Sequence, residues 1–301
     1  MELPHDPRWP RAGHWLRDGA STSAQLAVLG VPAHETSISP TNAHQTPAAI
    51  RDALLRYSTY HQELDVDIRE LSVIDLGDVT APDHAEGEAR VRKSVEALNK
   101  ESLLGVLGGD NSITYSIMSA VFGDDLATAG LITFDAHHDL RDGTSNGSPV
   151  RRLIDAGLNP RNIVQIGIAD FSNSAEYSAL ARDLGIKVVS RAQVRNNSIE
   201  SVVRDALHQL QTQTSGIYVD FDIDVCDRSV VPACPAAAPG GISADELRQA
   251  ARLIGASLNV RAFDIAEIDA SKDSSDGRTV RLGALVLLEV AAGRLSALRS
   301  K

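Results

Sequence analysis

Three ionisable side chains follow one apolar segment near the middle of the chain. Asp135, His137 and Asp139 come after the run 128–133, which is typical of a buried strand. Residues two apart on extended backbone point the same way, so we expect these side chains to converge. Holding two carboxylates and an imidazole together away from water is costly unless a cation neutralises them, which makes a divalent metal the natural candidate. A solvated acidic loop is the alternative.

A second acidic cluster ends another apolar segment. Asp220, Asp222 and Asp224 alternate with apolar residues, so they would share one face of a strand. Three buried carboxylates raise one another's pKa unless something neutralises them. Together the two clusters could hold two divalent ions, and carboxylate and imidazole donors suit Mn²⁺ better than the thiolate sets of structural zinc. Two ions about 3.5–4 Å apart can share a hydroxide that acts as a nucleophile at neutral pH.

Both clusters lie in a chain that alternates strand-like and helix-like segments. The strand-like segments are apolar along their whole length, which indicates a mostly parallel sheet covered on both faces. We therefore predict a three-layer α/β/α fold in a single domain, residues 1–301, with an irregular N-terminal arm at 1–22 held by Trp9 and Trp15. Ligands of such sheets bind at the carboxyl ends of the strands. Polar residues follow four predicted strands, at Asp110-Asn111, at Asp135, His137 and Asp139, at Asp222 and Asp224, and at Glu267.

Composition limits the classes of partner. The 301 residues carry a formal net charge of -11 without a basic run, which argues against a nucleic-acid partner. No stretch is long and apolar enough to cross a bilayer, and the N-terminus does not look like a secretory signal. Cys226 and Cys234 are expected to be free thiols rather than a disulfide framework. These features favour a cytoplasmic protein that acts on a small molecule, away from membranes.

Four segments, in this order, resemble motifs of the ureohydrolase family, which comprises arginases, agmatinases and formiminoglutamases. They are Gly108-Gly-Asp-Asn-Ser112, Asp135-Ala-His-His-Asp139, Asp222-Ile-Asp-Val-Cys-Asp227 and Ala262-Phe-Asp-Ile-Ala-Glu267. Three ordered metal motifs followed by a glutamate are specific, and the resemblance spans most of the chain. It implies the arginase fold, hydrolysis of a linear amidine C–N bond, and a homo-oligomer that is a trimer or a hexamer.

The resemblance also implies roles for individual residues. The metal ligands would be Asp135 and Asp222, which bridge two Mn²⁺ ions, His137 and Asp224 on one ion, and Asp139 and Asn111 on the other. The bridging hydroxide would attack the amidine or guanidine carbon. Glu267 would bind the substrate N–H groups and orient that carbon, so Asp139 and Glu267 are the predicted catalytic residues.

Two asparagines replace histidines of the family. The family usually has His where this chain has Asn111, and a neutral carbonyl oxygen is a weaker ligand than imidazole. The ion beside Asn111 would therefore bind weakly, or the site would hold one ion only. Asn146 stands where arginases and agmatinases carry a proton-shuttling His, and this resembles the formiminoglutamases. A simple turn residue is the alternative for Asn146.

A basic residue near the second motif suggests an acidic substrate. Arg141 lies two residues past Asp139, where formiminoglutamases have Arg and arginases have Asn, and a guanidinium can bind a carboxylate through two hydrogen bonds. A surface ion pair with Asp142 is the alternative. With Arg141, the predicted substrate contacts are Asn146, Ser148 and Glu267.

Three functions remain open from the sequence. The most specific is hydrolysis of N-formimino-L-glutamate to L-glutamate and formamide, which rests on Arg141 and Asn146. The second is hydrolysis of a guanidine such as agmatine or guanidinobutanoate, with release of urea. The third is a metal-poor pseudoenzyme or regulatory subunit of a hetero-oligomer, because Asn111 and Asn146 both replace histidines.

Overall fold

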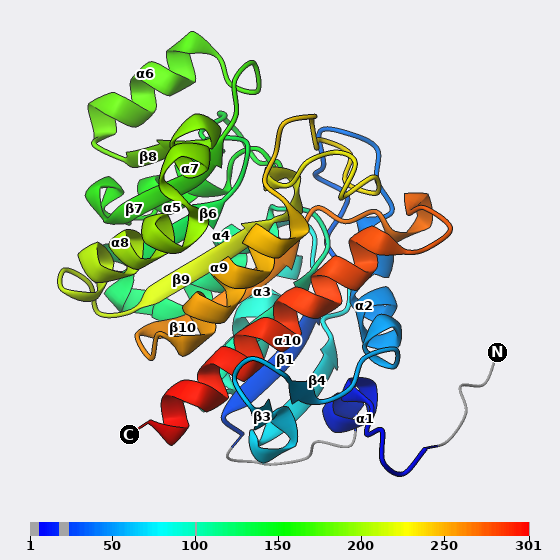
Figure 1. The fold of residues 1–301 in the computed structure, drawn as a ribbon. Coiled ribbons are helices and arrows are strands. Elements are labelled where there is room, and N and C mark those ends of the chain that lie inside the picture. Colours follow the sequence, from blue (N-terminus) through cyan, green and yellow to red (C-terminus); the bar gives the residue numbers. More distant parts are fainter. Residues whose placement is uncertain (1–5, 18–23, 100, 301) are drawn as a thin grey trace.

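The central feature is one sheet of eight parallel strands, in the order β4-β1-β5-β10-β9-β6-β7-β8 (Figure 1). This computed structural model describes residues 6–17, 24–99 and 101–300. The strands are β1 (Leu26–Val31), β4 (Val73–Asp78), β5 (Leu103–Gly108), β6 (Gly130–Phe134), β7 (Ile163–Ile168), β8 (Lys187–Ser190), β9 (Ile217–Asp222) and β10 (Val260–Ala266). A separate antiparallel hairpin joins β2 (Tyr60–His61) to β3 (Val66–Asp67).

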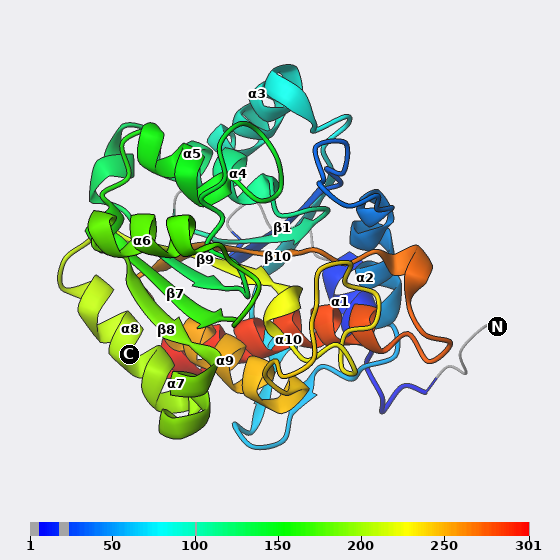
Figure 2. The same cartoon turned by 90° about the horizontal axis from the view of Figure 1, so that it is seen from above.

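Helices cover both faces of this sheet (Figure 2). One face carries α3 (His84–Glu96), α4 (Ile113–Phe122), α5 (Pro149–Asp155) and α6 (Ala175–Leu184). The other carries α1 (Ala12–Arg17), α2 (Thr46–Leu54), α7 (Arg191–Asn197), α8 (Ile199–Gln211), α9 (Ala244–Ala256) and α10 (Arg278–Arg299). None of the helices within the described ranges combines the length and the apolarity that a bilayer crossing requires.

Alternate residues of the strands explain why both faces need a cover. In β1, Leu26 and Val28 pack into the core on the α10 side, whereas Ala27 and Leu29 pack into the core on the α4 side. A strand that is apolar at every position can be buried only between two helical layers. The predicted three-layer α/β/α architecture is therefore confirmed.

The N-terminal arm differs from its prediction. Residues 1–22 were expected to be irregular, but Ala12–Arg17 forms α1, which buries Ala12 and Leu16. A helix of six residues is too short to show a periodic pattern and depends on tertiary contacts. Trp15 makes one such tertiary contact, since its Nε1 donates to the carbonyl of Leu71 at 3.1 Å. The side chain of Trp9, in contrast, is 53% exposed. Residues 1–5 and 18–22 of the predicted arm lie outside the described ranges.

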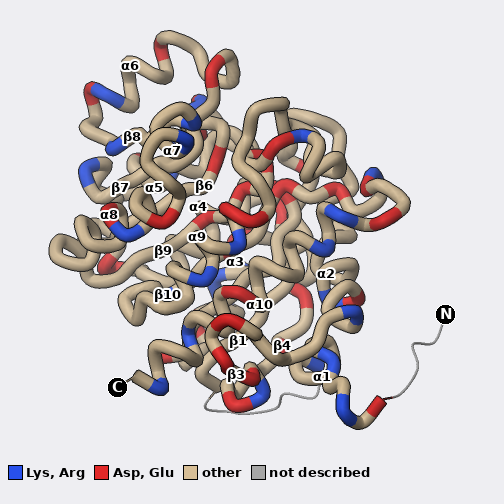
Figure 3. The backbone as a smooth tube through the Cα atoms, viewed as in Figure 1, with Lys and Arg blue, Asp and Glu red and all other residues tan. Residues whose placement is uncertain are grey.

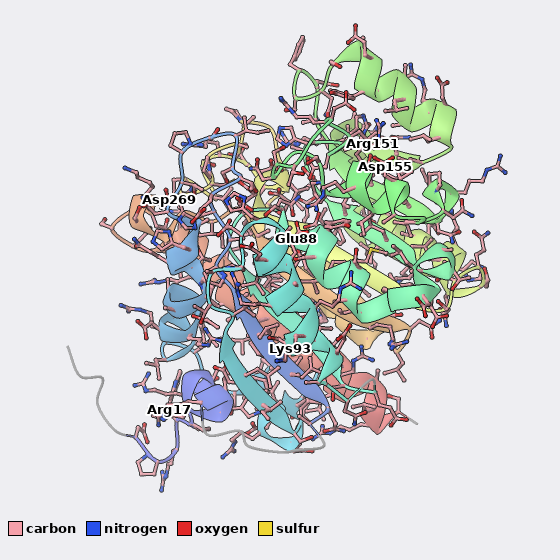
Figure 4. All side chains as sticks on the ribbon, turned by 180° about the vertical axis from the view of Figure 1, so that it is seen from behind. Arg17, Glu88, Lys93, Arg151, Asp155 and Asp269 are labelled. Carbon is pink, nitrogen blue, oxygen red and sulfur yellow. The ribbon has the colours of Figure 1, made fainter. Side chains whose placement is uncertain are left out.

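Helices α3 and α5 are joined on the face seen from behind in Figure 4, where Glu88 is labelled on α3 and Arg151 and Asp155 on α5. The guanidinium of Arg152 donates to both carboxylate oxygens of Glu88, at 2.7 and 3.0 Å. This half-buried pair anchors α5, which follows directly on the loop 139–148. That loop carries most of the predicted substrate contacts, and the pair fixes the helix on which the loop ends.

The strand order brings the segments of the predicted site together at one edge of the sheet. The four strands followed by chemistry-bearing residues are β5, β10, β9 and β6, which are consecutive neighbours in the middle of the sheet. Because all four are parallel, their carboxyl ends share one edge. In Figure 3 acidic segments, coloured red, lie beyond the ends of β6 and β9. Four segments that are far apart in the chain therefore meet at one place.

Candidate active site

Three metal-ligand side chains converge beyond β6 and β9. Single donor atoms of Asp135, His137 and Asp224 all lie within 4.8 Å of one another, and both carboxylates are buried. Asp135 is the first residue after β6, and its Oδ1 accepts a hydrogen bond from the backbone N–H of His137 at 2.6 Å. Asp222 ends β9, and its Oδ1 accepts from the backbone N–H of Asp224 at 2.9 Å, which turns the chain into a short 3₁₀ helix. Asp224 therefore reaches the cluster from a turn and not, as expected, from an extended strand.

Two oxygens in this cluster lack hydrogen-bond donors. Asp135 Oδ2 and Asp224 Oδ2 are buried and accept no hydrogen bond from any described residue. His137 Nδ1 lies 2.7 Å from Asp224 Oδ2, but without the alignment of a hydrogen bond. Buried carboxylate oxygens without donors are costly, and a divalent cation would satisfy them. Carboxylate and imidazole donors in this arrangement fit Mn²⁺.

The electrostatics of the cluster agree with a missing positive charge. Burial, together with the charge of Asp224, raises the pKa of Asp135 to about 6. Burial also raises the pKa of Asp222 well above its ordinary range, and the nearby Asp224 and Asp135 add to the effect. Burial alone would lower the pKa of His137, but Asp135 and Asp224 raise it to about 12. The pocket thus favours whatever brings positive charge into it.

Asp139 and Asn111 lie beside this cluster and contact each other. Asn111 Nδ2 is 2.7 Å from Asp139 Oδ2, and both residues are buried. The backbone does not stay extended as far as Asp139, which has a φ of +53°, so simple alternation does not describe its direction. Asn111 follows a tight turn in which a side chain at Gly109 would lie 1.9 Å from the carbonyl oxygen of Ala33, so only glycine fits there.

Glu267 sits opposite, at the end of β10. It is 4% exposed, and its Oε1 accepts hydrogen bonds from the backbone N–H of Asn111 and from Asn146 Nδ2, both at 2.8 Å. Burial, with the charge of Asp110 next in effect, raises the pKa of Glu267 to about 8. Asn146 Oδ1 in turn accepts from the backbone N–H of Ile38 at 2.9 Å. Asn146 is therefore more than a turn residue, because it links Glu267 to the loop after β1.

A cavity of about 340 Å³ opens over these side chains. Its walls include seven of the predicted site residues, which are His137, Asp139, Arg141, Asn146, Asp222, Asp224 and Glu267. The remaining wall contains Ile38, Asn173, Tyr177 and Ala236.

The two other predicted substrate contacts have different outcomes. Arg141 lies in the cavity wall, and no ion pair of its side chain is found among the described residues. The proposed pairing with Asp142 is made instead by Arg151, at 3.3 Å. Ser148 is fully buried away from the cavity, and its hydroxyl accepts from the backbone N–H of Ser145 and donates to the carbonyl of the same residue. The structure does not bring Ser148 to the cavity, because it closes the turn before α5.

One contributor was missed by sequence reasoning. Asn173 follows β7, and its side chain donates to the carbonyl of Ala136 at 2.9 Å and accepts from the backbone N–H of His138 at 2.9 Å. It thereby fixes the backbone on both sides of His137. The signal was present, since Asn173 is a polar residue shortly after an apolar strand, but β7 carries no acidic cluster that would draw attention to it.

A larger cavity of about 560 Å³ lies between the β2–β3 hairpin, α9 and α10. Its cations are already neutralised, since Arg248 contacts the buried Glu289 at 2.7 Å and Arg252 contacts Glu63. Volume alone would not select the cavity of about 340 Å³, since a further cavity of about 600 Å³ lies beside α3 and α4, but the unsatisfied acceptors and the metal-type cluster lie at the cavity of about 340 Å³. We therefore place the candidate active site at that cavity.

Comparison with known proteins gives the family. The profile of the arginase family matches residues 24–293. The chain belongs to the arginase family. It is 37% identical over 279 residues to the formimidoylglutamase of Halalkalibacterium halodurans, an alignment that covers 89% of this chain and 87% of that one. The resemblance inferred from the sequence motifs is thus confirmed.

Solved structures agree with this membership. The crystal structure of formimidoylglutamase from Bacillus subtilis superposes with a TM-score of 0.90 at 32% identity, covering 98% of this chain and 95% of that one. A formiminoglutamase from Trypanosoma cruzi, solved with Mn²⁺, has a TM-score of 0.86 at 23% identity and covers 95% and 98% of the two chains. The predicted arginase-like fold is confirmed by both.

Proposed function

We propose that this arginase-family chain hydrolyses N-formimino-L-glutamate. Water adds to the formimino carbon, the bond between that carbon and the glutamate nitrogen breaks, and L-glutamate and formamide leave. One observation carries the proposal: the cavity that contains the acidic metal-type cluster also contains Arg141, a guanidinium for which no carboxylate partner is found among the described residues. A substrate with an amidine at one end and carboxylates at the other matches that pairing.

The metal is part of the proposal. Asp135, His137 and Asp224 would hold one Mn²⁺, and we propose a second ion between Asp139 and Asn111. When bound, the metal supplies a water molecule that is acidic enough to act as a nucleophile at neutral pH. The ligand set, the unsatisfied oxygens of Asp135 and Asp224, and the Mn²⁺ in the Trypanosoma cruzi crystals support this choice.

Glu267 has the geometry to orient the amidine. Asn111 and Asn146 both donate to Oε1, which leaves Oε2 to accept an N–H from the substrate. Because the carboxyl group is fixed by two donors from different segments, the reacting carbon would be held in one place relative to the metal cluster. Arg141 would bind a substrate carboxylate at the other end of the cavity, and this fixes the length of substrate that fits.

Two alternatives make different predictions. A guanidine hydrolase acting on agmatine has no use for Arg141, because that substrate lacks a carboxylate, whereas 4-guanidinobutanoate has one and must be distinguished by its product, urea. A metal-poor pseudoenzyme would not need the three converging donor atoms or the buried oxygens without donors. The relatives named formimidoylglutamase, at 37% identity in sequence and a TM-score of 0.90 in structure, support the first proposal over both.

The decisive experiment is a substrate panel with Mn²⁺-loaded protein. N-formimino-L-glutamate, agmatine and 4-guanidinobutanoate are each incubated with the protein, and formamide and urea are quantified. We expect formamide from the first and little urea from the others. Urea release from agmatine or 4-guanidinobutanoate at a higher kcat/KM would contradict the proposed substrate. No turnover, with less than one metal per chain, would favour the pseudoenzyme.

We further propose that the chain acts in the cytoplasm as a homo-oligomer, a trimer or hexamer, as the family resemblance implies. Light scattering on the purified chain measures the subunit count. A monomer at micromolar concentration would contradict this part of the proposal.

A further inference from the structure

The amide of Asn111 lies at one end of a buried hydrogen-bond chain that the reaction itself does not use. Asn111 Nδ2 lies 2.7 Å from Asp139 Oδ2, and Asn111 Oδ1 lies 3.0 Å from Thr114 Oγ1. Thr114 Oγ1 lies 2.8 Å from Asp264 Oδ2. The Tyr218 hydroxyl donates to the same oxygen of Asp264 at 2.6 Å. All five residues are buried. Apart from Asp139, which lines the cavity, these side chains are shielded from water, so the available protein donors decide which way the amide points.

Thr114 has one proton and two acceptors beside it. Its hydroxyl can donate either to Asn111 Oδ1 or to Asp264 Oδ2, but not to both. A hydrogen bond to a carboxylate is the stronger of the two. Asp264 Oδ2 is also the nearer acceptor, at 2.8 Å from Thr114 Oγ1 against 3.0 Å for Asn111 Oδ1. Once Thr114 donates its proton to Asp264, its hydroxyl oxygen can only accept a hydrogen bond from the amide of Asn111.

The amide of Asn111 can donate a hydrogen bond to Thr114 Oγ1 if it rotates by a half-turn, which exchanges the positions of Nδ2 and Oδ1. Nitrogen and oxygen of an asparagine amide have nearly the same shape, so a half-turn exchanges them without new contacts. With oxygen toward Asp139, Nδ2 donates to Thr114 and Thr114 donates to Asp264, and each donor then has one acceptor. With nitrogen toward Asp139, Asp139 gains a donor but Thr114 must serve two acceptors. A cation placed between Asn111 and Asp139 requires the first arrangement.

We propose that Thr114 is a positioning residue for the second metal ion: its hydroxyl, anchored on Asp264, accepts a hydrogen bond from Asn111 Nδ2 and so turns the amide oxygen toward the ion beside Asp139. The inference rests on the proposed function, because that function includes the second ion. It explains how a neutral amide can stand in for the family's imidazole: Thr114 stabilises the amide orientation that the ion requires, which is the reverse of the orientation described above. Asp264, on β10, supplies this anchor from the centre of the sheet.

Metal binding to three variants tests the proposal. Metal-free wild type, Thr114→Val, Thr114→Ser and Tyr218→Phe are titrated with MnCl₂ by calorimetry, and coupling between paired ions is followed by electron paramagnetic resonance. In Thr114→Val we expect the Kd of the weaker ion to rise about 10- to 100-fold, with loss of the coupling signal and no change at the tighter ion. Thr114→Ser should restore the wild-type values. Tyr218→Phe removes a buried hydroxyl from the same chain but leaves Thr114 donating to Asp264, so both ions should bind as in wild type.

Three results would overturn the proposal. Thr114→Val could bind both ions as wild type does, both ions could weaken equally, or Thr114→Ser could fail to restore the weaker ion. If Thr114→Val does not fold, a crystal structure of the Mn²⁺-loaded wild type decides instead. Direct contact between the amide and the ion, with Thr114 still in hydrogen-bond distance of the amide, supports the proposal, and a water molecule between ion and amide contradicts it. These readouts are independent of the substrate panel, so the proposed function and this inference can fail separately.

Discussion

Asn146 Nδ2 donates to Glu267 Oε1 at 2.8 Å, although 121 residues separate the two in the chain. The contact ties the loop before α5 to the end of β10, and it lies at the wall of the substrate cavity. It also gives a structural role to Asn146, which by the family resemblance stands where arginases and agmatinases carry a histidine: the side chain fixes the carboxyl group of Glu267.

Replacing Asn146 with Ala should therefore weaken catalysis without removing metal. Glu267 would keep only the backbone N–H of Asn111 as a donor to Oε1. A hydrogen bond to a charged group contributes about 1.5–3 kcal/mol, so we expect kcat/KM to fall by about 10- to 100-fold. Steady-state kinetics and Mn²⁺ content are measured on the same sample. A loss of metal in step with activity would mean that Asn146 supports the ligands rather than Glu267.

Removing one central ligand should abolish metal binding. In Asp135→Asn the neutral amide keeps the shape of the side chain but loses the charge that the cation needs. We expect the affinity for Mn²⁺ to fall by more than about 100-fold, with activity at the level of metal-free protein. Calorimetric titration with Mn²⁺ measures the affinity. Asp142→Asn is the matched control, since its side chain is 82% exposed and pairs with Arg151 at 3.3 Å, and this variant should bind metal normally.

Arg141→Ala should separate acidic substrates from neutral or basic ones. Loss of a two-bond guanidinium–carboxylate contact raises KM for N-formimino-L-glutamate by about 100-fold, with a smaller change in kcat. Residual turnover of agmatine, which has no carboxylate, should stay the same. Equal losses on both substrates would show that Arg141 acts through the shape of the loop 139–148 instead of through charge.

Glu289 offers a stability test away from the site. Burial alone would raise its pKa, but His61 and Arg248 lower it below the ordinary 4.5. A carboxyl group with a depressed pKa in the folded state stabilises the fold above the unfolded pKa and loses that contribution as the pH falls through the folded value. Glu289→Gln should therefore reduce the free energy of unfolding by about 2 kcal/mol at pH 7.

The pH dependence of that difference is the critical observation. Thermal unfolding of wild type and Glu289→Gln is compared at pH 7, 5 and below 4. The gap in Tm should be the same at pH 7 and 5 and should narrow only below the ordinary carboxyl pKa. If the difference in Tm between wild type and Glu289→Gln stays the same down to the lowest pH, the substitution acts through the packing of α10 and not through the ion pairs.

Sequence reasoning located the site because of how parallel sheets bury their strands. Apolar runs end abruptly in Asp135 and Asp222, and that contrast is visible without a structure. The strand order is not visible, since β10 joins β5 to β9 although it is the last strand in the chain. The direction of single side chains is also lost once the backbone leaves the strand, as Asp139 with its φ of +53° shows. Ser148 was misassigned for the same reason: a hydroxyl near a motif can equally well close a turn.

Buried polar partners within the sheet were the hardest to foresee. Thr114 and Asp264 look like ordinary helix and strand residues in the sequence, and only the register brings them together across 150 positions. Tyr218 joins them because β9 and β10 are paired. Which strands pair depends on contacts between residues far apart in the chain, and a pattern of neighbouring residues does not predict them.

The place of β10 has a consequence for how the protein matures in the cell. β10 is synthesised last among the strands, yet it separates β4-β1-β5 from β9-β6-β7-β8 and carries Glu267 at its end. A ribosome-bound chain that lacks residues 260–267 has two unjoined half-sheets and two exposed edges. The first cluster, at Asp135, and the second, at Asp224, can approach each other on β6 and β9 before that, but Asn111 on the β5 side cannot. If the two proposed ions bind, the first could therefore be captured before β10 is in place, and the second only after β10 has joined the two half-sheets.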